Sequence, residues 1–341
     1  MAPALMLTEL LAEPLRAQAL EAADWASVLS IARAEQLLGA LADRLEGVPV
    51  PARVAAILGD ARAAAVHERR TALWEGEMAW RALAPLGVPV VLLKGTAYAA
   101  AGLAAGQGRS IGDLDLLVPR DGLPDVEAAL LKAGWEWVKV DAYDDDYYRS
   151  WMHELPPLVH AERDRMADVH HTILPPTARS TPNPALLIGD AVILENGLRV
   201  LSPPHMVIHA AAHLVADGDL AGGLRNLWDI DRLTREFLDE DGFTEALIDE
   251  AARHQLAPAV ARALRLAHAV YGTPAGLLDV RLTPADRVFL RRLVARDEWG
   301  RETRPMTRLA FYIRSHWLRM PPAMLARHLW VKWRRGAPTT R

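Results

Sequence analysis

Two aspartates separated by one residue, Asp113 and Asp115, carry the clearest chemical signal in this sequence. They follow Gly112 and open an apolar run that ends at Val118, which predicts a short buried strand. Residues i and i+2 of a strand project from the same face, so the two carboxylates are expected to point together. Neighbouring carboxylates raise each other's pKa unless a cation neutralises them, and hard divalent metals take oxygen ligands. The pair therefore predicts a Mg²⁺ site, with Mn²⁺ as an alternative ion; the simpler interpretation is an acidic strand end that faces water.

A second motif lies upstream, where the apolar run 90–93 ends in Lys94, Gly95 and Thr96. The run predicts a strand and the Ala-rich segment 97–105 predicts a helix, so the glycine stands at a strand-to-helix turn. Such a glycine lets backbone N–H groups approach a phosphate, and Thr96 adds a hydroxyl donor. Only four of the 39 basic residues are lysines, which hints that a compact ammonium is wanted at Lys94. The other interpretation is an ordinary turn in which Thr96 caps the helix.

Two further residues extend the candidate site. Asp168 lies in an alternating segment, 166–173, which predicts a strand that pairs with 155–160 across a tight turn at 163–165. It is either a third carboxylate of the site or a surface residue on an edge strand. Arg109, four positions before Asp113, could reach a phosphate or pair with an acidic residue, and the sequence leaves both open.

These motifs resemble a known family. Leu-Lys-Gly-Thr-x-Tyr at 93–98 and Arg-x-x-x-Asp-x-Asp-x-Leu-Val at 109–118 are similar to the nucleotidyltransferase superfamily of the DNA polymerase beta type. They are more similar still to a bacterial family of uncharacterised nucleotidyltransferases within it. That family has a glycine-centred phosphate loop, then a metal-binding Asp-x-Asp, then a third acidic residue on a later strand. The third motif matches Asp168 in Asp-x-His, and His213, Arg225 and Asp229 resemble a helical-domain motif expected to line or support the cleft.

The resemblance implies an enzyme that moves an NMP group from an NTP, with ATP as the first choice, to a hydroxyl acceptor on a small molecule, peptide or protein. Within it, Asp113, Asp115 and Asp168 would be the catalytic, metal-binding carboxylates. The nucleotide would be bound by Lys94, Gly95, Thr96 and Arg109. An acceptor hydroxyl would attack the α-phosphate in line and release pyrophosphate.

Two other functions stay open at this point. One is a catalytically inactive nucleotide-binding or scaffold subunit of a biosynthetic complex. The other is a γ-phosphotransferase, since lysine, glycine and paired aspartates also serve kinases. The sequence contains neither a Walker A motif nor the His-Arg-Asp and Asp-Phe-Gly motifs of protein kinases.

The spacing of apolar residues divides the chain into four parts. Helical spacing predicts an N-terminal helical region over 1–86, and alternating short apolar runs and helices predict a nucleotidyltransferase-like core over 87–202. Within this core, Asn196-Gly197 predicts a hairpin with a type I′ turn. Helical spacing returns over 203–300, before a basic aromatic tail over 301–341. The predicted fold class is α/β (α+β), a mixed sheet flanked by N- and C-terminal helical regions.

Histidines recur every four residues in the third part, at His205, His209 and His213, with Asp217 at the next interval. Two histidines at i and i+4 can bind zinc. The stripe is Ala-rich, however, and lacks the adjacent glutamate of a zincin, so core packing is the favoured interpretation.

The tail over 301–341 has ten basic residues, one acid, Glu302, and five interleaved aromatic residues. It is expected to pack its aromatic face on the protein. Peripheral binding to an anionic membrane or an acidic partner is the next interpretation, and nucleic acid the last.

The composition limits which classes of protein and which kinds of site are possible. The chain is 51% hydrophobic and 24% charged, which is typical of a soluble globular protein. It has no cysteine, which excludes disulfides, a thiolate nucleophile and Cys-based metal sites. A pI near 6.3 gives no general case for nucleic-acid binding. No basic leader precedes Glu9, and no apolar run approaches the ~20 residues that cross a bilayer, so a cytoplasmic location is expected.

Overall fold

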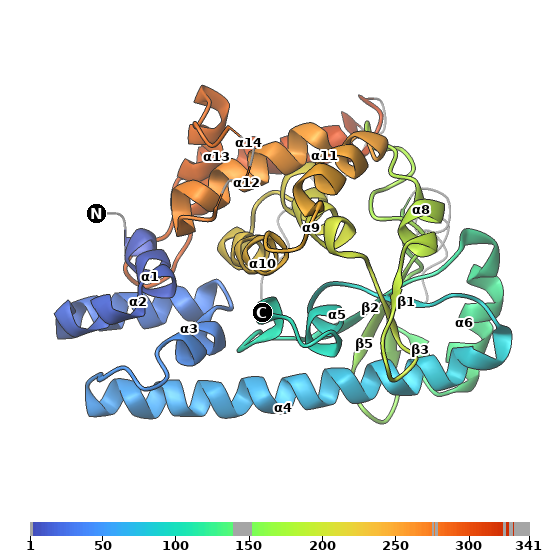
Figure 1. Ribbon diagram of the computed structural model, residues 1–341, viewed down its shortest axis with the longest axis horizontal. Helices are drawn as coiled ribbons and strands as arrows, with labels where there is room; N and C mark the ends of the chain where they lie inside the picture. Colours follow the sequence, from blue (N-terminus) through green and yellow to red (C-terminus); the bar gives the residue numbers. More distant parts are fainter. Residues whose placement is uncertain are drawn as a thin grey trace.

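The centre of the molecule is a mixed β-sheet. The structure is a computed structural model that describes residues 3–138, 152–274, 276, 279–322, 325, 326 and 330. Among these residues the sheet has seven strands in the order β3-β4-β5-β2-β1-β7-β6, flanked by helices (Figure 1). The strands are β1 (Val91–Leu92), β2 (Asp113–Leu117), β3 (Trp135–Trp137), β4 (Leu158–His160), β5 (Met166–His170), β6 (Val192–Ile193) and β7 (Arg199–Val200). The predicted α/β class with flanking helical regions is confirmed.

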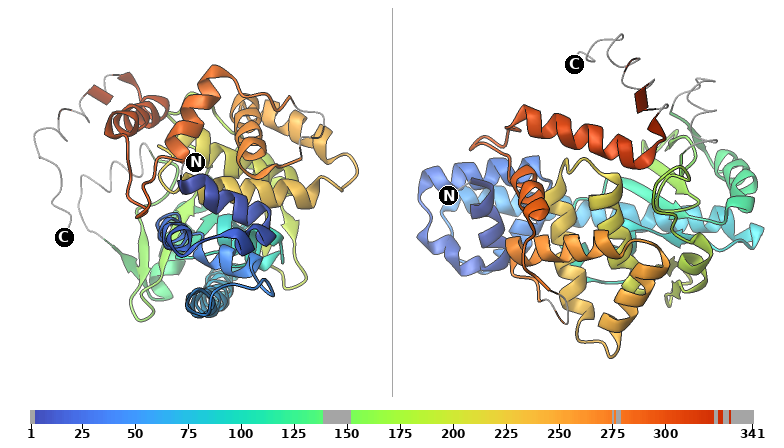
Figure 2. Two further views of the ribbon diagram at one scale, coloured as in Figure 1. Left: turned by 90° about the vertical axis from the view of Figure 1, so that its left-hand side faces the viewer. Right: turned by 90° about the horizontal axis from the view of Figure 1, so that it is seen from above.

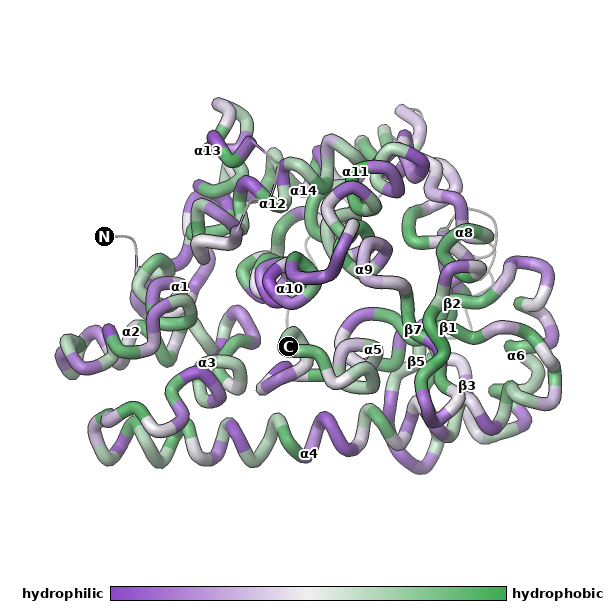
Figure 3. Tube along the Cα trace, in the orientation of Figure 1, coloured by the Kyte–Doolittle hydropathy of each residue, from purple (hydrophilic) through white to green (hydrophobic). Residues whose placement is uncertain are grey.

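Strands β2 and β5 run parallel in the middle of the sheet, in a register that pairs Asp115 with Asp168. β1 is antiparallel to β2 and parallel to β7, which makes the sheet mixed. The leucines of β2 are fully buried, as its apolar run predicts, and β1 is hydrophobic along its length (Figure 3). Because β4 and β2 lie on either side of β5, Asp168 does not stand on an edge strand.

The predicted hairpins form, with one correction. β4 and β5 pair antiparallel, and the ladder begins after Pro157 because proline cannot donate to it. β6 and β7 also pair, but their turn is not type I′, since that turn needs a positive φ at both central residues and Asn196 has none. Instead, Gly197, with φ 83°, ends a three-residue loop closed by Leu194 and Leu198. Strand β3 ends at Trp137, and residues 139–151 lie outside the described part.

Helix α4 (Ala52–Leu83) runs along the whole molecule, beneath the N-terminal helices and the sheet alike (Figure 1). It packs on α3 (Leu38–Arg44), α5 (Lys94–Ala100), α6 (Leu123–Lys132) and β2. Hydrophobic and hydrophilic residues alternate along it, as expected for a helix with one buried face (Figure 3). The first two helices are α1 (Pro3–Ala12) and α2 (Ala22–Ala34), joined by the 3₁₀ turn η1 (Pro14–Ala19).

The C-terminal helices pack over the sheet and against the N-terminal ones. They comprise α8 (Pro184–Gly189), α9 (Pro203–Ala211), the π-helical turn η5 (Ala212–Asp217), α10 (Gly223–Phe237), α11 (Phe243–Arg253), α12 (Ala257–Tyr271), α13 (Pro284–Leu293) and α14 (Pro305–Arg319). α10 lies between α9 and α12, and α1 contacts α12. Buried Glu35 ties the two regions together, because its carboxylate accepts from the Leu224 backbone N–H and from Arg296 Nε.

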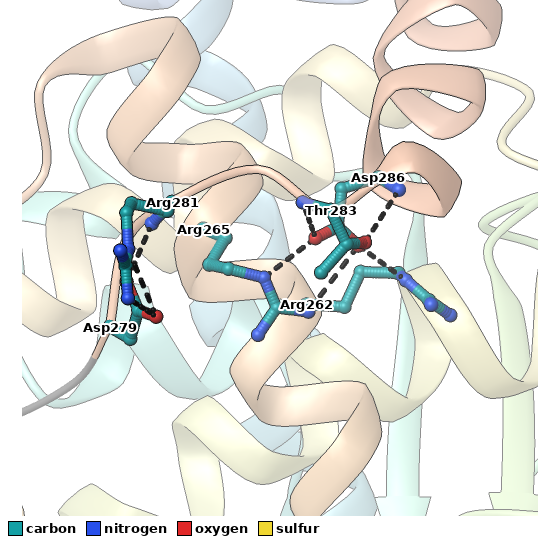
Figure 4. Close-up of polar contacts among 6 residues, drawn as sticks. All are labelled: Arg262, Arg265, Asp279, Arg281, Thr283 and Asp286. Atoms are coloured by element: carbon teal, nitrogen blue, oxygen red, sulfur yellow. Dashed lines mark hydrogen bonds and ion pairs between the residues drawn. The ribbon is translucent and has the colours of Figure 1, made fainter.

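A buried carboxylate joins α12 to α13 (Figure 4). Asp286 accepts from Arg262 at 2.8 Å and Arg265 at 2.6 Å, both on α12. It also forms a reciprocal capping box with Thr283 at the start of α13. Burial alone would raise the pKa of Asp286, but these donors hold it well below its usual range. The connection before α13 is thereby fixed to the helical body.

The tail begins with α14, which runs along the outside of the molecule (Figure 2). Phe311 is buried and meets Phe289 edge-on at 4.9 Å, and Arg314 donates to the Val215 carbonyl. Phe311 therefore packs on the protein as expected of the tail, whereas Trp317 on the same helix is 42% exposed, and most residues after 322 lie outside the described part. None of the helices described is both long and apolar enough to cross a membrane.

Candidate functional site

Three carboxylates converge where β2 begins. One oxygen from each of Asp113, Asp115 and Asp168 lies within 4.8 Å of the other two. Asp113 is exposed, Asp168 is half-buried, and Asp115 is 2% exposed. The i, i+2 spacing brings the first pair to one face, and the parallel register of β2 and β5 adds the third. The three predicted metal ligands therefore form one group.

Lys94 belongs to the same group. Its Nζ lies 2.6 Å from Asp115 Oδ1. Burial lowers the pKa of Lys94, but Asp115, and then Asp113 and Asp168, raise it above its ordinary value. Its φ of 48° is left-handed, a conformation that costs a non-glycine residue about 1 to 2 kcal/mol. Such strain persists where the surrounding structure imposes it, often at functional sites. The side chain pairs here with a carboxylate, whereas the sequence suggested a phosphate ligand.

His170, two residues after Asp168, contacts the group from β5. Its Nε2 lies 3.0 Å from Asp115 Oδ1 and its Nδ1 lies 3.3 Å from Glu154 Oε2. Burial lowers the pKa of His170, but hydrogen bonding to Asp115 and the charge of Glu154 raise it above its ordinary value. Burial would likewise raise the pKa of Asp115, yet Lys94 and His170 hold it far below its usual range. Two protein cations thus neutralise the innermost aspartate.

Asp168 is not neutralised in the same way. Burial, Glu154 and Asp115 together raise its pKa to about 7. Near neutral pH the negative charge of the carboxylates therefore exceeds the positive charge that Lys94 and His170 supply. A site of this kind favours either a proton or a divalent cation.

Two cavities adjoin the carboxylates and share Lys94, His209 and His213 in their walls. The first, of about 150 Å³, extends between α5, β2, α9 and α10. Its other lining residues are Tyr98, Arg109, Asp113, Ala210, Arg225, Asn226 and Asp229. The second, of about 170 Å³, lies on the β5 side. Its other lining residues are Met152, His153, Glu154, His170, Ile173 and Arg319. His213, Arg225 and Asp229 therefore line the cleft, as the family resemblance implied.

Arg109 is paired with an acidic residue. It is buried, its Nη2 lies 3.0 Å from Asp229 Oδ2, and its Nε contacts both oxygens of that carboxylate. Of the two options left open by the sequence, the structure shows the ion pair. Arg225 faces the same cavity, and its Nε is buried without a hydrogen-bond partner among the described residues. Burial and the nearby charge of Arg109 lower the pKa of Arg225.

Gly95 and Thr96 follow Lys94 in the first turn of α5, and both are buried. A Cβ at Gly95 would overlap the Arg109 guanidinium and crowd Ile111, so this glycine makes room for the buried ion pair. Thr96 is 1% exposed, and its hydroxyl oxygen has no hydrogen-bond partner among the described residues. Contact of either residue with a phosphate stays a prediction.

The three histidines of the stripe, which runs from α9 into η5, lie in two different environments. His209 and His213 face the cavities, where burial and then Lys94 lower their pKa values, that of His213 to about 3. His205 instead contacts Glu250 of α11 and His254, the residue that follows this helix. A single zinc site along the stripe is therefore not formed by these histidines. His213 lies in the π-helical turn η5, a type of irregularity that occurs frequently at functional sites.

Sequence reasoning missed Glu154 and His153 and gave His170 no role beyond its motif. An isolated bridge between Glu154 and His170, with the His171 N–H donating to the His153 carbonyl, holds the segment 153–154 against the end of β5. The only sequence signal was its position just before the predicted hairpin. The segment before it, 141–148, contains four aspartates and three tyrosines and lies outside the described residues.

The comparisons with known proteins agree with this geometry. A family described as "Uncharacterised nucleotidyltransferase" matches residues 21–272, about three quarters of the chain and all of the site residues above except Arg319. A search of curated proteins returned no match. The chain belongs to this family of uncharacterised nucleotidyltransferases.

Proposed function

We propose that this protein transfers an NMP group from an NTP, with ATP as the first choice, to a hydroxyl acceptor in a Mg²⁺-dependent reaction. The observation that carries the proposal is the group of three carboxylates beside Lys94, a residue that lines two cavities, in a chain of a nucleotidyltransferase family. One cavity would take the nucleotide and the other the acceptor.

The residues present fit a divalent cation. Asp113, Asp115 and Asp168 offer only oxygen ligands, which Mg²⁺ prefers, and Mn²⁺ accepts the same donors. Lys94 Nζ stands 2.6 Å from Asp115, so a protein cation already occupies part of the space where positive charge is needed. When bound there, the metal would supply charge neutralisation for the transferring phosphoryl group.

The first cavity suits a triphosphate. Arg109 and Asp229 neutralise each other, so the cations that this cavity offers to an anion are Lys94 and Arg225. The buried Nε of Arg225 has no partner among the described residues, as expected of a donor that awaits a ligand. We expect Arg225 to bind phosphate directly and Arg109 to position α10, which carries both Arg225 and Asp229. Thr96 and Gly95 stay in the proposal as the phosphate loop of the family.

The second cavity suits an acceptor hydroxyl. Burial, then the charges of Glu154, which lines this cavity, and of Asp115, raise the pKa of Asp168, so Asp168 would accept a proton from the hydroxyl. Two histidines that are neutral near pH 7, His209 and His213, separate this cavity from the first and can donate or accept a hydrogen bond without adding charge.

The experiment is label transfer with the full chain, using NTPs labelled at the α- or γ-phosphate together with fractionated cell extract. Transfer of the α-label with release of pyrophosphate is the expected result, and Asp113→Asn should abolish it. Asp60→Asn, at an exposed aspartate on α4, is the matched control and should keep full transfer.

The other two functions predict different results from the same assay. A γ-phosphotransferase would move the γ-label only, and a scaffold subunit would bind nucleotide without moving either label. Mg²⁺-dependent α-label transfer that survives Asp113→Asn would show that the carboxylate group is not the site of the reaction.

A further inference from the structure

A second set of potential metal ligands lies beside the carboxylates, in the wall of the second cavity. Donor atoms of His153, Glu154 and His170 all lie within 4.8 Å of one another. His170 Nδ1 is 3.3 Å and His153 Nε2 is 3.9 Å from Glu154 Oε2. In a tetrahedral site with bonds of about 2.0 to 2.1 Å, two ligand atoms stand about 3.3 Å apart. The His170–Glu154 pair already has this spacing, and the His153–Glu154 pair needs a movement of about half an ångström.

The hydrogen bonding of His170 leaves the correct nitrogen available. Its Nε2 faces Oδ1 of Asp115, a carboxylate that can only accept, so Nε2 carries a proton whether the ring is neutral or charged. Nδ1 points toward Glu154, and a metal held by Glu154 would replace the proton on this nitrogen. A metal-bound histidine ordinarily donates its other N–H to a carboxylate or carbonyl in this way.

His153 supplies a second, independent sign. The residue is 9% exposed, and its Nδ1 is buried with no hydrogen-bond partner among the described residues. Its ring stacks on that of His170, with centroids 5.2 Å apart and an interplanar angle of 26°. Its Nε2 lies 3.9 Å from Glu154 Oε2, too far for a hydrogen bond, so a metal would bind this nitrogen without breaking a hydrogen bond to Glu154.

We propose that His153, Glu154 and His170 bind a divalent transition metal of the zinc class, distinct from the Mg²⁺ proposed for the three aspartates. Two imidazoles and one carboxylate favour zinc and similar ions over Mg²⁺, which takes oxygen ligands. Three protein ligands leave a fourth position, typical of a site that also binds water or an oxygen of a substrate. The second cavity, which these residues line, is the space from which that ligand would enter. The site does not depend on the proposed transfer reaction.

The chain contains a matched control for this argument. His205, Glu250 and His254 also place their donor atoms within 4.8 Å of one another. There, however, the Asn183 backbone N–H donates to His254 Nδ1 at 3.1 Å, so Nε2 of the neutral ring carries the proton. That Nε2 lies 3.1 Å from His205 Nε2 and is used as a hydrogen-bond donor. A metal at this second group would need a deprotonated imidazolate, so we expect it to bind none.

The test is zinc binding to the full chain in a large excess of Mg²⁺, which occupies the oxygen sites. We expect one Zn²⁺ per chain, with two imidazole ligands in X-ray absorption at the zinc edge. His153→Ala and Glu154→Gln should each weaken zinc binding at least about tenfold. Glu250→Gln, the same change in the control group, should leave it unchanged. Melting curves of each variant without zinc show whether it is folded.

Three results would overturn the proposal. Wild-type protein that retains no zinc would mean that a proton, rather than a metal, lies between His170 and Glu154. Loss of zinc in Glu250→Gln but not in Glu154→Gln would place the metal at His205, Glu250 and His254 instead. Loss of zinc in Asp113→Asn, with His153→Ala unaffected, would place it on the aspartates.

Discussion

Replacing Asp115 by asparagine should destabilise the fold, whereas the same change at Asp113 should not. Asp115 is 2% exposed, and its Oδ1 faces both Lys94 Nζ and His170 Nε2. The amide would leave two cations beside a neutral group in a buried setting. Removing one partner of a buried ion pair costs about 3 to 5 kcal/mol. Lys94 and His170 each keep another carboxylate nearby, so we expect the lower end of this range.

Urea unfolding of the metal-free protein measures this loss. Asp113 is exposed, so Asp113→Asn should stay within about 0.5 kcal/mol of the wild type while losing activity. The double variant Lys94→Met/Asp115→Asn should be more stable than the sum of the two single changes predicts, since it removes both charges together. If Asp115→Asn and Asp113→Asn unfold at the same urea concentration, the pairing of Asp115 with Lys94 does not stabilise the fold and the reasoning fails.

Further predictions concern Asp168, the Arg109–Asp229 ion pair and Phe311. Mg²⁺ must displace a proton from Asp168, whose pKa is raised to about 7, so calorimetry should show affinity about tenfold weaker at pH 6 than at pH 8. Asp168→Asn should remove this pH dependence, and a tenfold change that persists in the variant would contradict the assignment. Because the folded pKa exceeds the unfolded one, the metal-free protein should also lose stability as pH rises from about 4 to about 7. Arg109→Met should cost about 3 to 5 kcal/mol in chemical unfolding, and Arg109→Met/Asp229→Leu should cost less than the single change; strictly additive costs would show that the pair is not coupled. Phe311→Ala should cost about 3 kcal/mol and lower the melting temperature, while Trp317→Ala, 42% exposed, should change it little; equal effects would contradict the packing of α14 through Phe311.

Local patterns predicted the parts of the site that local geometry controls. The alternation of side chains along a strand placed Asp113 beside Asp115, and the hairpin pattern placed Asp168 on a strand. The sheet class followed from the alternation of short apolar runs and helices. The hairpin around Asn196-Gly197 was also predicted, but its turn type was wrong, because one extra loop residue moved the positive φ to the glycine alone.

Contacts between distant segments could not be predicted in this way. Arg109 meets Asp229 across 120 residues, and Glu154 meets His170 only because an isolated bridge extends the β5 pairing. The spacing of the three histidines could be seen in the sequence. In the structure, however, His205 contacts Glu250 of α11, whereas His209 and His213 face the cavities. No periodicity in the sequence encodes which helix will pack on α9. The division into four regions stays a prediction, since hydrophobic residues from α1 to α14 form one continuous core.

The arrangement of charges explains why metal and nucleotide should bind together. Of the described residues that line both cavities, Lys94 is the one whose side-chain ammonium pairs with the carboxylate group, through Asp115. A divalent cation on the aspartates would replace that ammonium as the partner of Asp115. Lys94 could then turn toward the first cavity, where Arg225 already faces the space for a phosphate. We therefore expect NTP affinity to rise with Mg²⁺ in the wild type but not in Lys94→Met. Equal enhancement in both proteins would mean that Lys94 stays with the aspartates throughout.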